Sequence, residues 1–113
     1  MTAPRTPETV VLAELADELI ADLPHHAGGR AARTVLTGPT LRAVVLALGQ
    51  GNELAEHNAP GAATLYCITG DVTLRTHEQE WRVGAGGHVQ VPPEKHSVVA
   101  HVDSAVLLTV ALG

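Results

Sequence analysis

The sequence predicts an all-β domain, a small barrel or sandwich, that follows one N-terminal α-helix. Three observations lead to this prediction: a helical period near the start, many short apolar runs after residue 30, and a length of 113 residues that fits one domain. The apolar fraction of 45% and the charged fraction of 17% are typical of a folded globular chain. We divide the chain into the helix with its connector, residues 1–29, and the β domain, residues 30–113.

The helix is predicted from apolar residues that recur three and four positions apart. These residues are Leu12, Leu15, Ala16, Leu19, Ile20 and Leu23. Thr6 is expected to cap the helix, Pro7 to occupy its first position, and Pro24 to end it. We expect this helix, whose other side is acidic, to pack across the mouth of its own β domain or onto a partner subunit.

Nine strands are predicted in the rest of the chain. Runs rich in Val and Thr alternate with Gly and Pro turns at a spacing of about ten residues, which is typical of a sandwich or barrel. The predicted strands are 31–36, 41–48, 53–59, 63–69, 71–77, 80–83, 88–92, 96–101 and 105–111. Since no second helix long enough for a parallel crossover follows, the fold class is all-β with one helix.

The composition excludes several classes of function. The formal net charge is −5, and Tyr66 and Trp81 are the only aromatic residues, which argues against nucleic acids and anionic membranes as partners. No signal peptide is recognised and no apolar stretch has the length of a membrane span, so we expect a cytoplasmic protein. The single cysteine, Cys67, excludes an intrachain disulfide.

Two segments resemble the sequence motifs of the cupin family. Residues 51–70, GNELAEHNAPGAATLYCITG, resemble the first motif, in which a glycine is followed after five residues by a histidine, here His57. Residues 86–100, GGHVQVPPEKHSVVA, resemble the second motif, with its histidine at His96. The resemblance implies the family's fold, a single cupin-type jelly-roll β-barrel behind the N-terminal α-helix. It also implies a homodimer.

The resemblance implies a metal site of which this chain keeps half of the ligands. In the family, two histidines and a glutamate of the first motif and one histidine of the second hold the metal. The matching positions are His57, Ala59, Ala63 and His96. Catalytic sites usually take three protein ligands, so two imidazoles should bind a divalent transition metal weakly or not at all. Glu94 and Glu53 are the candidates for a third ligand, and no cofactor is assured.

The mouth of the predicted barrel is the candidate ligand site. Residues two apart in a strand share a face, and this parity extends the motif positions to a predicted lining. The predicted lining residues are His57, Ala59, Ala63, Leu65, Cys67, His96 and Val98. We expect the small side chains among them to leave a void for a small ligand, largely apolar and either uncharged or anionic.

The predicted function is therefore small-molecule binding, with no assured catalysis. Two alternatives stay open. One is a metal-dependent cupin enzyme, a dioxygenase or isomerase, with altered metal ligands. The other is a structural or regulatory dimeric module that acts through its surface instead of its cavity.

Overall fold

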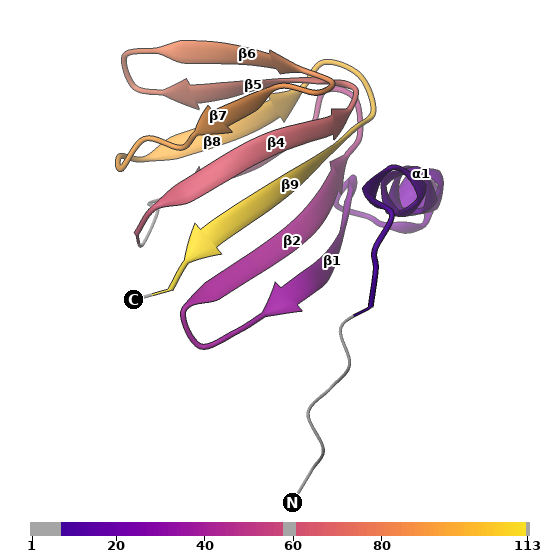
Figure 1. The fold of residues 1–113 in the computed structure, drawn as a ribbon. Coiled ribbons are helices and arrows are strands. Elements are labelled where there is room, and N and C mark those ends of the chain that lie inside the picture. The colour runs from indigo at the N-terminus through magenta and orange to yellow at the C-terminus, as the bar shows by residue number, and fades with distance from the viewer. Residues whose placement is uncertain (1–7, 58–60, 113) are drawn as a thin grey trace, which may run out of the picture.

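The computed structural model describes residues 8–57 and 61–112, with the backbone alone at residues 55–57. These ranges form one α-helix, one short 3-10 helix and nine strands (Figure 1). In chain order they are α1 (Leu12–Asp22), η1 (Leu23–His25), β1 (Arg30–Thr37), β2 (Leu41–Leu48), β3 (Glu53–His57), β4 (Ala63–Thr69), β5 (Asp71–Thr76), β6 (Glu80–Gly84), β7 (His88–Gln90), β8 (His96–Ala100) and β9 (Ser104–Ala111). Neither helix combines the length and the apolar character that a membrane crossing requires.

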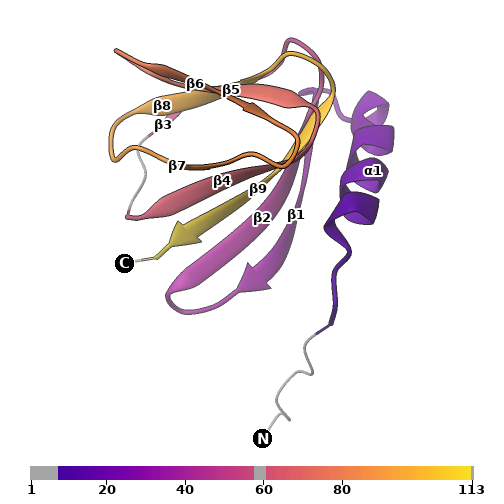
Figure 2. The same ribbon diagram turned by 45° about the horizontal axis from the view of Figure 1, so that its top comes forward.

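The strands form two antiparallel sheets. The first has the order β1-β2-β9-β4-β7 and the second the order β3-β8-β5-β6. The sheets face each other, and a hydrophobic cluster fills the space between them (Figure 2). In the described ranges no strand of one sheet pairs with a strand of the other. The structure thus shows an all-β fold of two facing sheets, and closure into a barrel stays a prediction.

Strand periodicity gives the first sheet two apolar faces. Side chains alternate between the faces of a strand, so the near-continuous apolar sequences of β2, β4 and β9 supply both. Leu65 and Val106 lie in the cluster between the sheets. Their neighbours on the opposite face, Ile68 and Leu107, belong to a second cluster together with Val45. This second face needs a cover.

Helix α1 covers that outer face. Leu15 and Leu19 are buried against Val45 and Ala47 of β2, and Leu23 of η1 completes the contact. The acidic side of the helix faces away from the sheet, as its exposed positions show. The structure corrects the expectation that the helix crosses the mouth of the β domain, because its apolar side matches the outer face of the first sheet.

The start of the helix also differs from the prediction. Thr6 and Pro7, the predicted cap and first helical position, lie outside the described residues. The described residues up to Val11 are not helical, and Val11 is extended, with φ −86° and ψ 102° and no side-chain cap bond. Two adjacent β-branched residues, Val10 and Val11, disfavour helix, and neither has a buried surface to pack against. The helix begins at Leu12, the first apolar residue that contacts the sheet.

Candidate functional site

A narrow cavity lies between the two sheets and includes three of the predicted site residues. Its volume is about 10 Å³, measured as the space open to the centre of a water molecule, which is about enough for one water. The lining residues are Leu46, Leu54, Leu65, Leu74, Val91, His96, Val98, Val106 and Leu108. Among the described residues, the cavity therefore has an apolar wall with a single polar side chain, that of His96.

His96 is held in a defined orientation at the start of β8. It is 3% exposed, and its Nδ1 lies 2.9 Å from the carbonyl oxygen of Glu94. A carbonyl oxygen only accepts hydrogen bonds, so Nδ1 carries a proton and donates it to Glu94. In the neutral imidazole Nε2 is then the acceptor nitrogen. The backbone of Glu94 thus selects the tautomer of His96, the polar side chain among the described lining residues.

The fold brings the backbone of His57 opposite His96. The two residues are partners in the antiparallel pairing of β3 with β8. The register shifts between Leu54, which faces Val98, and His57, so three steps along β3 match two along β8. Two histidines that lie 39 positions apart in the sequence therefore occupy one register position. Ala59 lies outside the described residues.

The remaining predicted residues are divided between the cavity and the surrounding core. Leu65 and Val98 line the cavity with His96. Ala63 and Cys67 belong to the same buried cluster, but they do not line the cavity. The described lining is leucine and valine, not the alanine-rich void that we expected. The physical reason is that long side chains from strands of the facing sheet, such as Leu74 of β5, fill the space that small ones leave.

Cys67 is a core residue whose surroundings, in the described part of the chain, disfavour nucleophilic chemistry. Its side chain is fully buried, and its thiol lies 3.5 Å from the carbonyl oxygen of Thr69, to which it donates. Burial raises the pKa of the Cys67 thiol, and the negative charge of Asp71 raises it further. Since the thiolate is the nucleophilic form, both effects make this cysteine less reactive.

The described side chains do not fit a catalytic metal site. No group of three or more His, Cys, Asp or Glu side chains comes together in the described part of the chain. Glu53 pairs with Val99, the neighbour of the cavity residue Val98, so strand alternation places it on the opposite face. Glu94 is exposed and contacts His96 through its carbonyl oxygen. Among the described residues, neither carboxylate lines the cavity with His96.

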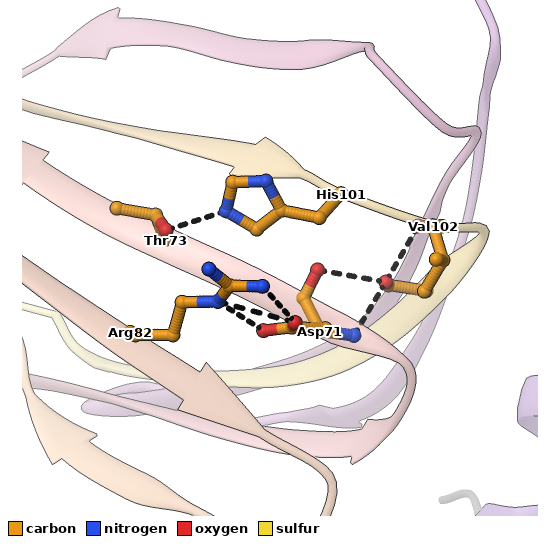
Figure 3. A network of polar contacts seen from close by, with 6 residues as sticks. Asp71, Thr73, Arg82, His101 and Val102 are labelled. Carbon is orange, nitrogen blue, oxygen red and sulfur yellow. Dashed lines mark hydrogen bonds and ion pairs between the residues drawn. The ribbon is translucent and has the colours of Figure 1, made fainter.

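A second polar cluster, which the sequence analysis missed, lies on the outer face of the second sheet (Figure 3). Arg82 Nε donates to both carboxylate oxygens of Asp71, at 3.0 and 3.1 Å. His101 Nε2 lies 2.6 Å from Thr73 Oγ1. The register of the β5–β6 hairpin, which sets Thr73 opposite Arg82, creates this cluster. The sequence did contain one sign of this cluster: Asp71 and Thr73 are two positions apart in a predicted strand, so their side chains share a face.

Ser104 ties this cluster to the start of β9. The fully buried Ser104 hydroxyl accepts a hydrogen bond from the backbone N–H of Asp71, at 3.0 Å. It lies 2.7 Å from the carbonyl oxygen of Val102, to which it donates. All these polar groups have partners within the cluster, so the arrangement indicates a structural role.

Acid should weaken the Asp71 contact. The hydrogen bonds from Arg82 hold the pKa of the Asp71 carboxyl below its ordinary value. A depressed pKa contributes stability that is present above the unfolded value, about 3.9, and is lost as the pH falls through the folded value. We expect Arg82→Gln to lose less unfolding free energy than the wild type when the pH is lowered from about 5 to about 2. Urea unfolding at both pH values measures this difference. Asp71→Asn should also lose less unfolding free energy in acid than the wild type. If both variants lose as much as the wild type, the Asp71–Arg82 contact is not the cause of the acid sensitivity.

Comparisons with known proteins give matches in structure alone. No family model matches the sequence, and no curated protein matches it. A conserved protein of unknown function from Streptococcus pyogenes superposes with a TM-score of 0.70 at 24% identity, and the match covers 78% of each chain. An RmlC-like cupin from Shewanella frigidimarina has a TM-score of 0.70 at 20% identity, with 77% of this chain and 79% of that chain covered.

An enzyme also shares the architecture. A mutant of salicylate 1,2-dioxygenase from Pseudoaminobacter salicylatoxidans has a TM-score of 0.71 at 20% identity. The match covers 86% of the present chain and 33% of that enzyme. At these identities the likeness concerns the fold, and the neighbours include both an enzyme and a protein of unknown function, so they do not decide the activity.

Proposed function

Because the chain has the cupin fold, we propose that it binds a small molecule between its two sheets, at the cavity that His96 lines. The observation that supports this proposal is one buried imidazole of fixed orientation in an otherwise apolar wall. Apolar pockets with a few placed polar groups are typical of ligand sites, where the apolar wall gives affinity and the polar group sets orientation.

The size of the cavity limits the part of the ligand that is buried. A space for about one water admits a methyl or hydroxyl group without movement of the lining side chains. The ligand is therefore small and largely apolar, and either uncharged or anionic. A polar group of the ligand would lie against His96, the polar side chain among the described residues that line the cavity.

Binding is the proposed activity, and catalysis is not included. The described donors at this cavity amount to His96, with the backbone of His57 opposite to it. Two imidazoles fall short of the three protein ligands that a catalytic divalent ion usually takes. For this reason the binding hypothesis stands ahead of the metal-dependent enzyme.

Methyl-detected NMR tests the proposal with isobutanol and isobutyrate as probes. We expect the methyl resonances of Leu65, Val98 and Leu108, which line the cavity, to shift on titration, whereas those of Ile68, on the outer face beneath α1, stay unchanged. His96→Leu removes the polar group while keeping an apolar side chain, and we expect it to weaken isobutanol binding about fivefold, the value of one hydrogen bond.

The matched control is His88→Leu, an exposed histidine on the outer side of β7. It should leave the binding of both probes unchanged. Lining resonances that do not move up to the solubility limit of the probes would contradict the proposal. Shifts that appear only after Zn²⁺ is added would instead favour the metal-dependent enzyme.

A further inference from the structure

The face of the first sheet that lines the cavity becomes more exposed toward the start of β2. Leu48 and Leu46 belong to the central cluster, so strand alternation places Val44 and Arg42 on the same face. Leu48 is buried, Leu46 and Val44 are half-buried, and Arg42 is exposed. The opposite face of β2 is buried up to Ala43, near the strand start. The apolar surface of the cavity therefore continues beyond Leu46 and ends at a cation.

The neighbouring strand β9 continues this apolar surface beside β2. Leu108, which lines the cavity, pairs with Val44, and Val110 pairs with Arg42. Leu108 and Val110 are both half-buried and pack against the central cluster. Val44 and Val110 thus form an apolar floor between the cavity and the guanidinium of Arg42.

Arg42 lies at the same end of the fold as His96. Strand β8 begins at His96 and is joined to β9 by the short turn 101–103, so the start of β8 and the end of β9 both lie away from this turn. The end of β9 pairs with the start of β2, which carries Arg42 (Figure 1). With a rise of about 3.3 Å per residue, Arg42 is about 13 Å along β2 from the cavity residue Leu46. One elongated ligand can therefore reach both the cavity and the cation.

The charge of Arg42 has no counterion on its own sheet. The strands of this sheet, β1, β2, β4, β7 and β9, contain no acidic residue. Arg33, Arg75 and Arg82 form ion pairs with side chains of other elements, whereas Arg42 forms none within the described ranges. A guanidinium presents a planar set of donors that matches a carboxylate. The group that fits this end of the apolar surface is therefore a carboxylate.

We propose that the ligand is a carboxylate with an unbranched apolar chain of medium length. The chain would lie on Val44 and Val110 with its far end in the cavity beside His96, and the carboxylate would pair with Arg42. The cavity has space for about one water, so it admits the end of a chain, and the charged group stays at the exposed end of the surface. This inference rests on the proposed function, because it assigns the ligand class of the same cavity.

Isothermal titration calorimetry with octanoate and octanol tests the role of Arg42. The two probes share the chain and differ in the charge that the guanidinium would bind. Arg42→Gln should weaken octanoate binding about tenfold and leave octanol binding unchanged, because only the carboxylate forms a charged hydrogen bond there. Since Arg42 is exposed, the variant should keep the stability of the wild type in urea.

The matched control is Arg30→Gln, which changes an exposed arginine at the other end of the same sheet, opposite Leu48. It should leave the binding of both probes unchanged. If octanol shifts the methyl resonances of Leu65 and Val98 but Arg42→Gln binds octanoate as tightly as the wild type, the carboxylate class is wrong and the binding cavity stands. The same holds if Arg30→Gln weakens octanoate as much as Arg42→Gln does. If neither probe shifts these resonances, the proposed function fails as well.

Discussion

Gly70→Ala is expected to lower the free energy of unfolding by about 3 kcal/mol or more. Gly70 has φ +93°, a left-handed conformation that costs an alanine about 1–2 kcal/mol. A Cβ at this position would also lie 2.7 Å from the Cα of Ser104 and closer still to its hydroxyl. Ser104 is fully buried and hydrogen-bonded to Asp71 and Val102, so it has no space into which to move.

Two glycines of the same chain separate the causes of this effect. Gly86 has φ +86°, and a Cβ added there would have no atom within 4 Å, so Gly86→Ala should cost the conformational part alone, about 1–2 kcal/mol. Gly84 has neither a positive φ nor a close neighbour, and Gly84→Ala should change stability by less than about 0.5 kcal/mol. Urea unfolding of the three variants measures the series. If Gly70→Ala is as stable as Gly86→Ala, the close contact between the added Cβ and Ser104 does not add to the cost of the substitution.

Leu65→Ala is expected to lower the free energy of unfolding by about 2–5 kcal/mol. Leu65 is 1% exposed, belongs to the central cluster and lines the cavity. Truncation removes buried methyl groups and enlarges a space that the surrounding strands close only in part. Chemical denaturation gives the loss of stability, and the exposed Leu41, replaced in the same way, should change it by less than about 0.5 kcal/mol.

The same variant gives a second readout at the proposed site. A larger apolar cavity should admit benzene, which would raise the melting temperature of Leu65→Ala and leave that of the wild type unchanged. We expect this rise in melting temperature because Leu65 lines the cavity. Ala63 and Cys67, which are buried in the same cluster, do not line it. A variant destabilised by less than about 1 kcal/mol would show that the strands around Leu65 collapse into the space.

The candidate site was predictable from the sequence in part. Motif spacing selected His57 and His96, and the register of β3 with β8 sets their backbones opposite each other. Strand parity also selected Leu65 and Val98, which line the cavity. The size of the cavity was not predictable, because it depends on residues such as Leu46 and Leu108 that come from distant strands. Strand parity predicts the face on which a side chain lies, but it does not predict which side chains of other strands pack against it.

The elements of the fold followed from the sequence alone. Local rules were sufficient here: alternating or continuous apolar runs gave nine strands, and the helical period gave α1. The predicted ends lie within two residues of the observed ones, except that the predicted end of the strand 53–59 lies outside the described residues. The error in the helix start, predicted at Pro7 and observed at Leu12, also has a local cause, because the capping pattern was given more weight than the low helix preference of Val10 and Val11.

Only the tertiary structure decided how these elements are used. It placed α1 on the outer face of the first sheet, and it gave the cavity a described wall of leucine and valine around His96. Secondary structure depends on neighbours within a few positions, whereas each of these features depends on strands far apart in the chain. Their packing is settled when the side chains of facing layers meet.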